Sequence, residues 1–160
     1  MNDVQYSQEI KLYGYTFRFL QLIAPERDKQ GRIWRFHPQK EYRNRRGLLL
    51  SKYGRGDFCR FSIQPHDEAG VYLLVSRGDI IYIGETLNLT KRFNAGYGCI
   101  QPRGCFTPGG QVTNCKINKA ILRLSVRGKS VALYFLKTQR HKQVERKLLE
   151  RIRPKLNGRA

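Results

Sequence analysis

One carboxylate in the second half of the chain stands where an amphipathic helix normally places an apolar residue. Glu145 lies in segment 139–151, whose pattern predicts a helix. The residues three, four and seven positions later are Leu148, Leu149 and Ile152, so Glu145 is expected on the apolar face of that helix. An unpaired charge is costly to bury. The position therefore favours a functional carboxylate over a surface ion pair.

Two tyrosines and an arginine form a second group that could do chemistry. Tyr72 and Tyr82 lie in short apolar segments, and Arg92 follows the second tyrosine by ten residues. A guanidinium is a fixed fork that can hold two phosphate oxygens. A tyrosine, with an ordinary pKa of about 10, is a poor base unless cations lie nearby. Taken singly, each has a simpler explanation, since strands favour tyrosine and Arg92 could be an ordinary surface arginine.

The strands and helices expected around these residues indicate an α+β fold. Its core is expected to be a small three-stranded antiparallel sheet flanked by helices. Strands are predicted at 70–75, 80–83 and 129–136, and helices from Thr86 to about Asn94 and from Thr113 or Asn114 onward. Residues 96–113 hold five glycines and two prolines, which predicts a long loop.

Residues 1–66 are predicted to form a β-rich extension that packs on a core formed by residues 67–160. Alternation and short apolar runs predict strands at 11–20, 31–36 and 58–63. Residues 40–46 form a basic loop, which is explained either as solvated surface or as a DNA contact.

The turn between the first two core strands decides whether Tyr72 and Tyr82 can cooperate. A two-residue turn would place the two side chains on opposite faces of the sheet. A three-residue turn, Ser76 to Gly78, would put Tyr72 directly opposite Tyr82. We expect the three-residue turn, with Gly78 at positive φ.

The charge of the chain points to a polyanionic partner. Its 160 residues include 31 Lys and Arg against 12 Asp and Glu, a net charge of +19. Residues 86–160 carry 17 basic side chains and only two acidic ones, so a phosphate-binding surface is expected there. We expect no membrane segment, because no apolar run approaches the roughly 18–20 residues needed. The start of the chain lacks the pattern of a signal peptide, which predicts a cytoplasmic protein.

Other potential metal ligands have simpler explanations. The four cysteines contain no closely spaced pair of the kind that most structural zinc sites use, so we expect reduced, largely buried thiols. His141 lies one helical turn before Glu145. It is interpreted as a surface histidine, or as a neighbour of the site.

Several of these residues together resemble a known family. The ordered set Gly70-Val71-Tyr72, Tyr82-Ile83-Gly84, Arg92, Glu145 and Asn157 resembles the GIY-YIG nucleases over roughly residues 69–158. The stretch 109–116 is also similar to the restriction-endonuclease branch of that family.

The resemblance implies metal-dependent hydrolysis of DNA phosphodiester bonds at these positions. Tyr72 would be the general base or orient it, with Tyr82 as its hydrogen-bonding neighbour. Arg92 would hold the scissile phosphate, and Glu145 would be the protein ligand of one Mg2+ or Mn2+. Asn157 would complete the site. Many members carry His or Tyr four residues after the arginine; here Gly96 occupies that position, and Tyr97, one residue later, is the candidate.

The sequence therefore predicts an endonuclease acting on double-stranded DNA, most simply a Type II restriction endonuclease. Cutting both strands with one site per chain implies a homodimer. Lys91, Lys116 and Lys119 are candidate phosphate contacts. The alternatives are a structure- or single-strand-directed repair nuclease and a DNA-binding module without catalysis.

Overall fold

The computed structural model describes residues 6–158 and shows an α+β chain, as the sequence predicts. The chain forms two compact units, each assembled from segments distant in sequence. Unit 1 comprises residues 6–23, 64–90 and 129–158 of the described chain, and unit 2 comprises residues 24–63 and 91–128. The first 66 residues thus contribute to both units.

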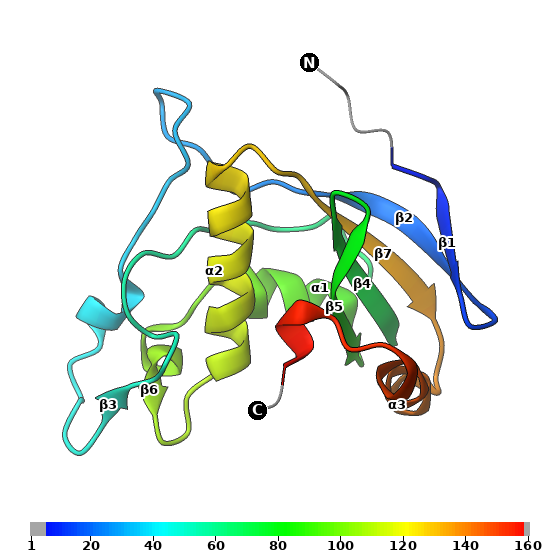
Figure 1. Ribbon diagram of the computed structural model, residues 1–160. Helices are drawn as coiled ribbons and strands as arrows, with labels where there is room; N and C mark the ends of the chain where they lie inside the picture. The colour runs from blue at the N-terminus through cyan, green and yellow to red at the C-terminus, as the bar shows by residue number, and fades with distance from the viewer. Residues whose placement is uncertain (1–5, 159–160) are drawn as a thin grey trace. The chain divides into compact units, whose positions relative to one another are not determined.

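Unit 1 is built on an antiparallel sheet of five strands rather than the three predicted, in the order β1-β2-β7-β4-β5 (Figure 1). Its strands are β1 (Glu9–Leu12), β2 (Tyr15–Ile23), β4 (Gly70–Ser76), β5 (Asp79–Thr86) and β7 (Val131–Lys137). The two additional strands are the N-terminal hairpin. Because β2 pairs with β7, it covers an edge that a three-stranded sheet would leave exposed.

The hairpin β1–β2 replaces the single strand predicted at 11–20. Tyr13 and Gly14 have positive φ values of 49° and 84°, which makes a tight turn between the two strands. The alternation of apolar and polar residues continues through Tyr13 and so suggests one unbroken strand. The chain reverses at this residue, however, and the Tyr13 side chain is half exposed (52%).

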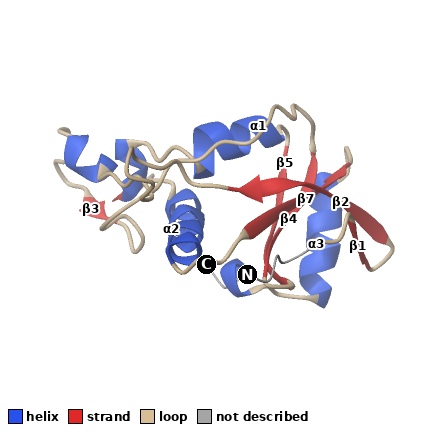
Figure 2. Cartoon of the chain, turned by 90° about the horizontal axis from the view of Figure 1, so that it is seen from above, coloured by secondary structure: helices blue, strands red, loops and turns tan. Residues whose placement is uncertain are grey.

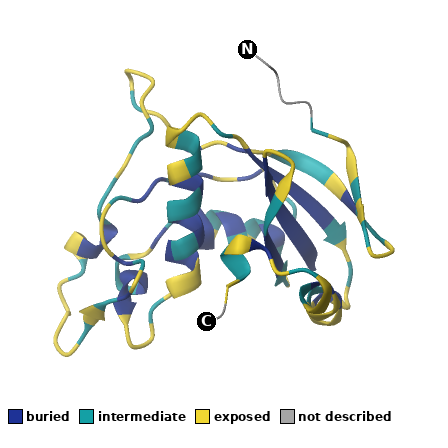
Figure 3. Cartoon of the chain, viewed as in Figure 1, coloured by how far each residue is buried: buried dark blue, intermediate teal, exposed yellow. Residues whose placement is uncertain are grey.

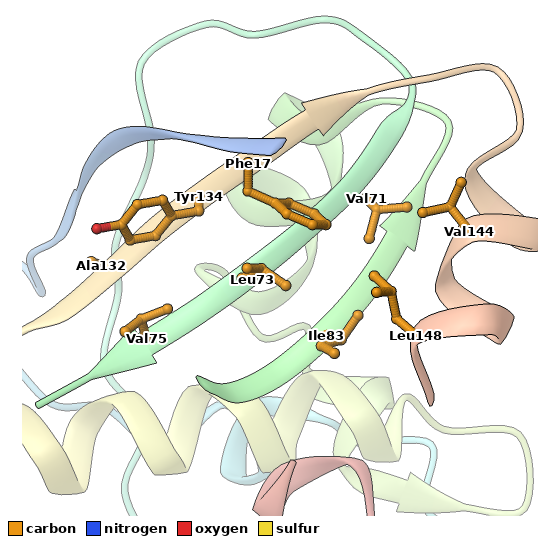
Figure 4. Close-up of a cluster of buried hydrophobic side chains, with 9 residues drawn as sticks. All are labelled: Phe17, Val71, Leu73, Val75, Ile83, Ala132, Tyr134, Val144 and Leu148. Atoms are coloured by element: carbon orange, nitrogen blue, oxygen red, sulfur yellow. The ribbon is translucent and has the colours of Figure 1, made fainter. Parts of the chain in front are cut away.

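Helix α3 (His141–Arg151) covers one face of this sheet (Figure 2). Its residues Val144 and Leu148 pack against Val71 and Ile83, which all lie in one cluster of buried apolar side chains (Figure 4). The central strands are the most deeply buried part of unit 1 (Figure 3). A short 3-10 turn, η4 (Lys155–Asn157), follows α3.

Unit 2 is mostly helix and irregular chain. Its elements are η1 (Pro38–Glu41), β3 (Leu49–Leu50), a π-helix (Phe93–Tyr97), η3 (Pro102–Cys105), β6 (Phe106–Thr107) and α2 (Val112–Val126). Helix α1 (Leu89–Arg92) spans the boundary between the units in the sequence and continues directly into the π-helix. The helix predicted from Thr86 to about Asn94 is therefore present, but it starts later and changes its hydrogen-bonding pattern.

The strands predicted at 31–36 and 58–63 are absent. The first segment contributes two isolated bridge residues, Ile33 paired with Arg27 and Phe36 paired with Phe58, and the second contributes only Phe58. A buried side chain holds the second segment instead. The Asn118 amide accepts a hydrogen bond from the Cys59 N–H at 3.0 Å and donates one to the Cys59 carbonyl at 2.8 Å. Backbone groups that a ladder would satisfy are thus paired with an amide from α2.

Candidate active site

Tyr72 and Tyr82 lie on the same face of the sheet, but not through the predicted turn. The turn has two residues, Arg77 and Gly78, both with positive φ (54° and 81°), as a type I′ turn requires. The positive φ expected for Gly78 is confirmed. The expected direct pairing is wrong, because Tyr72 lies opposite Gly84, and Tyr82 opposite Leu74.

A β-bulge restores the shared face that a two-residue turn alone would destroy. Leu74 pairs with Tyr82 and Val75 pairs with Ile80, so Ile81 is an extra residue on β5. This one-residue shift returns Tyr82 to the face of Tyr72. The two ring centroids lie 6.1 Å apart with an interplanar angle of 40°.

Gly84 allows the Tyr72 ring to lie across β5. A Cβ atom at residue 84 would overlap the hydroxyl and ring of Tyr72, so no other residue type fits without moving the ring. The Tyr72 side chain is fully buried, and Tyr82 is 9% exposed. The glycine of the second motif thus sets the position of the tyrosine of the first.

Glu145 lies on the other side of β5, where α3 packs. It is half-buried and lines a groove of about 460 Å3 together with Glu85, Leu149 and Arg153, among others. The register places Glu85 on the face of Val71, opposite to the face that carries the tyrosines. The tyrosines and the carboxylates therefore flank β5 from its two faces, and β5 is an edge strand of the sheet.

His141 and Glu85 form a pair that the sequence analysis missed. The His141 Nδ1 atom lies 2.5 Å from a carboxylate oxygen of Glu85, and the His141 side chain is 7% exposed. The interpretation of His141 as a surface residue is wrong; it is a neighbour of Glu145 on the same helix and ties α3 to β5. The signal available in the sequence was an acid directly after Gly84 and a histidine four residues before Glu145.

Asn157 acts on the backbone of β5. Its amide accepts a hydrogen bond from the Ile83 N–H and donates one to the Ile83 carbonyl, both at 2.8 Å. These are backbone groups that an edge strand leaves unpaired with another strand. Asn157 thereby fixes the strand between Tyr82 and Gly84.

Arg92 and Tyr97 contact each other within unit 2. The Arg92 Nε atom donates to the Tyr97 hydroxyl at 3.0 Å, and the guanidinium carbon lies 4.6 Å from the centre of the Tyr97 ring. The intervening chain is π-helical, which brings residues five apart onto one face, as an α-helix does for residues four apart. In an α-helix the residue four positions after Arg92, Gly96, would lie beside it. In the π-helix that place is taken by Tyr97, five positions after Arg92.

The candidate phosphate contacts differ in their surroundings. Lys91 is exposed and Lys116 is half-buried. Lys119 is turned inward: its ammonium donates to the Asp57 carbonyl at 3.1 Å and lies 4.0 Å from the centre of the Phe58 ring. Burial lowers the pKa of Lys119. Of the three, Lys91 is the most accessible to a phosphate.

The cysteines are free thiols, and three of the four are buried in unit 2. Burial raises the pKa of Cys59 to about 12, so it stays a thiol at neutral pH. Within residues 6–158 no cluster of three or more His, Cys, Asp or Glu side chains could hold a metal.

The structure thus brings together two groups of the predicted site residues. Unit 1 holds Tyr72, Tyr82, Glu145 and Asn157 around β5, and unit 2 holds Arg92 with Tyr97. No helix in the described part of the chain is both long and apolar enough to cross a membrane. Comparison of the chain with protein-family models, curated proteins and solved structures yields no match.

Proposed function

We propose that this protein is a metal-dependent endonuclease of the GIY-YIG type that hydrolyses double-stranded DNA, and that it is a Type II restriction endonuclease. One observation carries the proposal: the two motif tyrosines share a face with their ring centroids 6.1 Å apart. A two-residue turn alone would have separated them, and the bulge at Ile81 brings them together. The net charge of +19 supports a polyanionic substrate.

Each residue has a role in the proposed reaction. Tyr72, positioned by Tyr82 and Gly84, acts as or orients the general base that takes a proton from the attacking water. Arg92 holds the scissile phosphate, because a guanidinium binds two phosphate oxygens. The Tyr97 hydroxyl, which accepts a hydrogen bond from Arg92, orients that guanidinium.

The groove beside α3 has donors that suit a hard divalent cation. Mg2+ prefers oxygen ligands and commonly uses one or two carboxylates, with water and phosphate completing its shell. Glu145 would hold Mg2+ or Mn2+, and Glu85 lines the same groove. A bound ion would supply charge stabilisation at the phosphoryl oxygens. The Glu85–His141 pair keeps α3, and with it Glu145, in place against β5.

Cleavage of both DNA strands calls for two sites. Each chain carries one set of the proposed residues, so we infer that a homodimer acts on DNA.

The decisive test replaces Glu145 and compares it with a neighbour. Residues 86–160 contain only two acids, Glu145 and Glu150, and both line the groove, so Glu150→Gln is a matched control for Glu145→Gln. With plasmid DNA and Mg2+, we expect the wild type and Glu150→Gln to give discrete fragments. Glu145→Gln should bind DNA but cut at least about 100-fold more slowly, on the order of the loss seen when one group that stabilises charge in the transition state is removed.

Other outcomes would redirect the proposal. Cleavage by Glu145→Gln within about tenfold of the wild type would mean that the metal is held elsewhere. A smear, or cutting confined to single-stranded or branched DNA, would indicate a repair nuclease. DNA binding without any cutting would indicate a binding module.

A further inference from the structure

A second groove, within unit 2, combines arginines with the chain's single tryptophan. It has a volume of about 570 Å3, and its lining includes Trp34 and the exposed end of α2 at Val126. Its charged lining residues are Arg27, Asp28, Arg32 and Arg35. The lining holds three guanidiniums and one carboxylate, and Asp57 pairs with Arg35 beside it, so the groove keeps a net positive charge. None of these residues belongs to the site proposed above.

The loop on one side of this groove is closed by hydrogen bonds to Asp28. Its carboxylate accepts hydrogen bonds from the N–H groups of Gln30 and Arg32 at 2.9 and 3.0 Å. Asp28 and Arg32 also form a backbone hydrogen bond at 2.8 Å, and Arg27 donates to the Gly31 carbonyl at 2.7 Å. Arg27 and Arg32 thus belong to a hydrogen-bonded loop, so less backbone conformational entropy is lost when a ligand binds.

Trp34 is fixed in a similar way. Its ring stacks on Phe36 with centroids 5.0 Å apart, and the Arg60 guanidinium lies 4.9 Å from its centre. The ring remains only half-buried, and part of it lines the groove. Aromatic rings beside arginines are a common way of holding a nucleic-acid strand, with the ring against base or sugar and the guanidiniums on phosphates.

We propose that this groove binds the sugar-phosphate backbone of DNA, with Arg32 and Arg35 on phosphates and Trp34 against the adjacent deoxyribose. The identity of the polyanion rests on the proposed function. The side chains of Arg32 and Arg35 are 75% and 45% exposed, and their ion pairs with Asp28 and Asp57 span 3.2 and 3.4 Å. Exposed pairs of this kind are weak, so a phosphate can displace the carboxylates.

The tryptophan provides a direct probe of the groove. Because Trp34 is the only tryptophan, its fluorescence reports on this groove alone. The full chain is titrated with a short DNA duplex, and separately with one of its single strands, in EDTA to prevent cleavage. We expect saturable quenching or a spectral shift by the duplex, with weaker or no response to the single strand. A stronger response to the single strand would identify that as the bound form of the backbone.

Charge removal tests the phosphate contacts. The double variant Arg32→Gln/Arg35→Gln should reduce the slope of log affinity against log salt by about 2, because each lost phosphate contact removes about one. The control is Lys11→Gln/Arg18→Gln, which removes two exposed charges from the hairpin β1–β2 in unit 1. The control should retain the wild-type slope.

Three results would overturn the inference: no change in Trp34 fluorescence on DNA binding, an unchanged slope in the groove variant, or an equal loss in the control. These outcomes are separate from failure of the proposed function. Plasmid cleavage with an unresponsive groove would leave the nuclease intact and remove the groove proposal. If Trp34 fluorescence responds to DNA but no cleavage occurs in Mg2+, the groove proposal stands and the nuclease proposal fails.

Discussion

The ring of Tyr72 crosses β5 at Gly84, where a Cβ atom would overlap the phenol. This close approach ties the two motifs together at the scale of single atoms. A methyl group at residue 84 must displace a fully buried tyrosine or bend an edge strand, and interiors are packed too densely to absorb either change. The position of the Tyr72 hydroxyl therefore depends on a missing side chain.

Gly84→Ala is expected to lower the free energy of unfolding by about 1–3 kcal/mol, as other overpacking substitutions do. It should also slow DNA cleavage, because the Tyr72 hydroxyl moves. Urea denaturation of Gly84→Ala, Tyr72→Ala and the double variant measures the coupling. The cost of Gly84→Ala should largely vanish in the Tyr72→Ala background, whereas additive costs would contradict the overlap. Gly158→Ala, where a Cβ has space, serves as the control.

At the scale of elements, the turn and bulge between β4 and β5 act as one device. Arg77 has a φ of 54°, a left-handed conformation that costs an ordinary L-residue roughly 1–2 kcal/mol. Gly78 accepts the same region without strain. With the two-residue turn alone, Tyr82 would lie on the face opposite to Tyr72. The extra residue Ile81 shifts the strand pairing by one residue and returns Tyr82 to the face of Tyr72. Neither feature alone would place both tyrosines on one face.

Arg77→Asn should stabilise the protein by about 0.5–1 kcal/mol, because Asn-Gly is the favoured pair in a type I′ turn. The same replacement at Arg123, an exposed position inside α2, should destabilise by about 0.5 kcal/mol, since asparagine is a poorer helix former than arginine. Thermal or urea unfolding of both variants supplies the comparison. A loss of stability in Arg77→Asn would contradict the type I′ geometry.

The whole molecule is dominated by its charge. The chain has a net charge of +19 over 160 residues, so its basic side chains repel one another. Binding a polyanion reduces that repulsion. If the DNA complex contains roughly 6–10 phosphate contacts, the affinity for duplex DNA should fall by about 1,000-fold or more between 50 and 200 mM salt. Fluorescence anisotropy of a labelled duplex in EDTA measures this, with the unfolding temperature recorded at each salt concentration to verify that the fold is intact. A nearly flat response would contradict the polyanion interpretation.

The candidate site could be approached from the sequence because its cues are local. Strands β4, β5 and β7 and helices α2 and α3 follow from apolar runs and periodicity within single segments. The left-handed Gly78 followed from turn chemistry. The carboxylate at residue 145 could be singled out because its helical neighbours three, four and seven positions later are apolar.

Only the tertiary structure decided the pairings. The fourth and fifth strands form because β2 pairs with the edge of β7. In the segment predicted as a strand at 58–63, the backbone of Cys59 pairs with the Asn118 amide instead of with a neighbouring strand. The pairing of His141 with Glu85 depends on the register of β5, which turns Glu85 toward α3. The contact of Arg92 with Tyr97 depends on the π-helical turn between them. Local propensity is set within a few residues, but register, strand number and side-chain partners are set by which distant segments satisfy each other's hydrogen bonds and apolar surface.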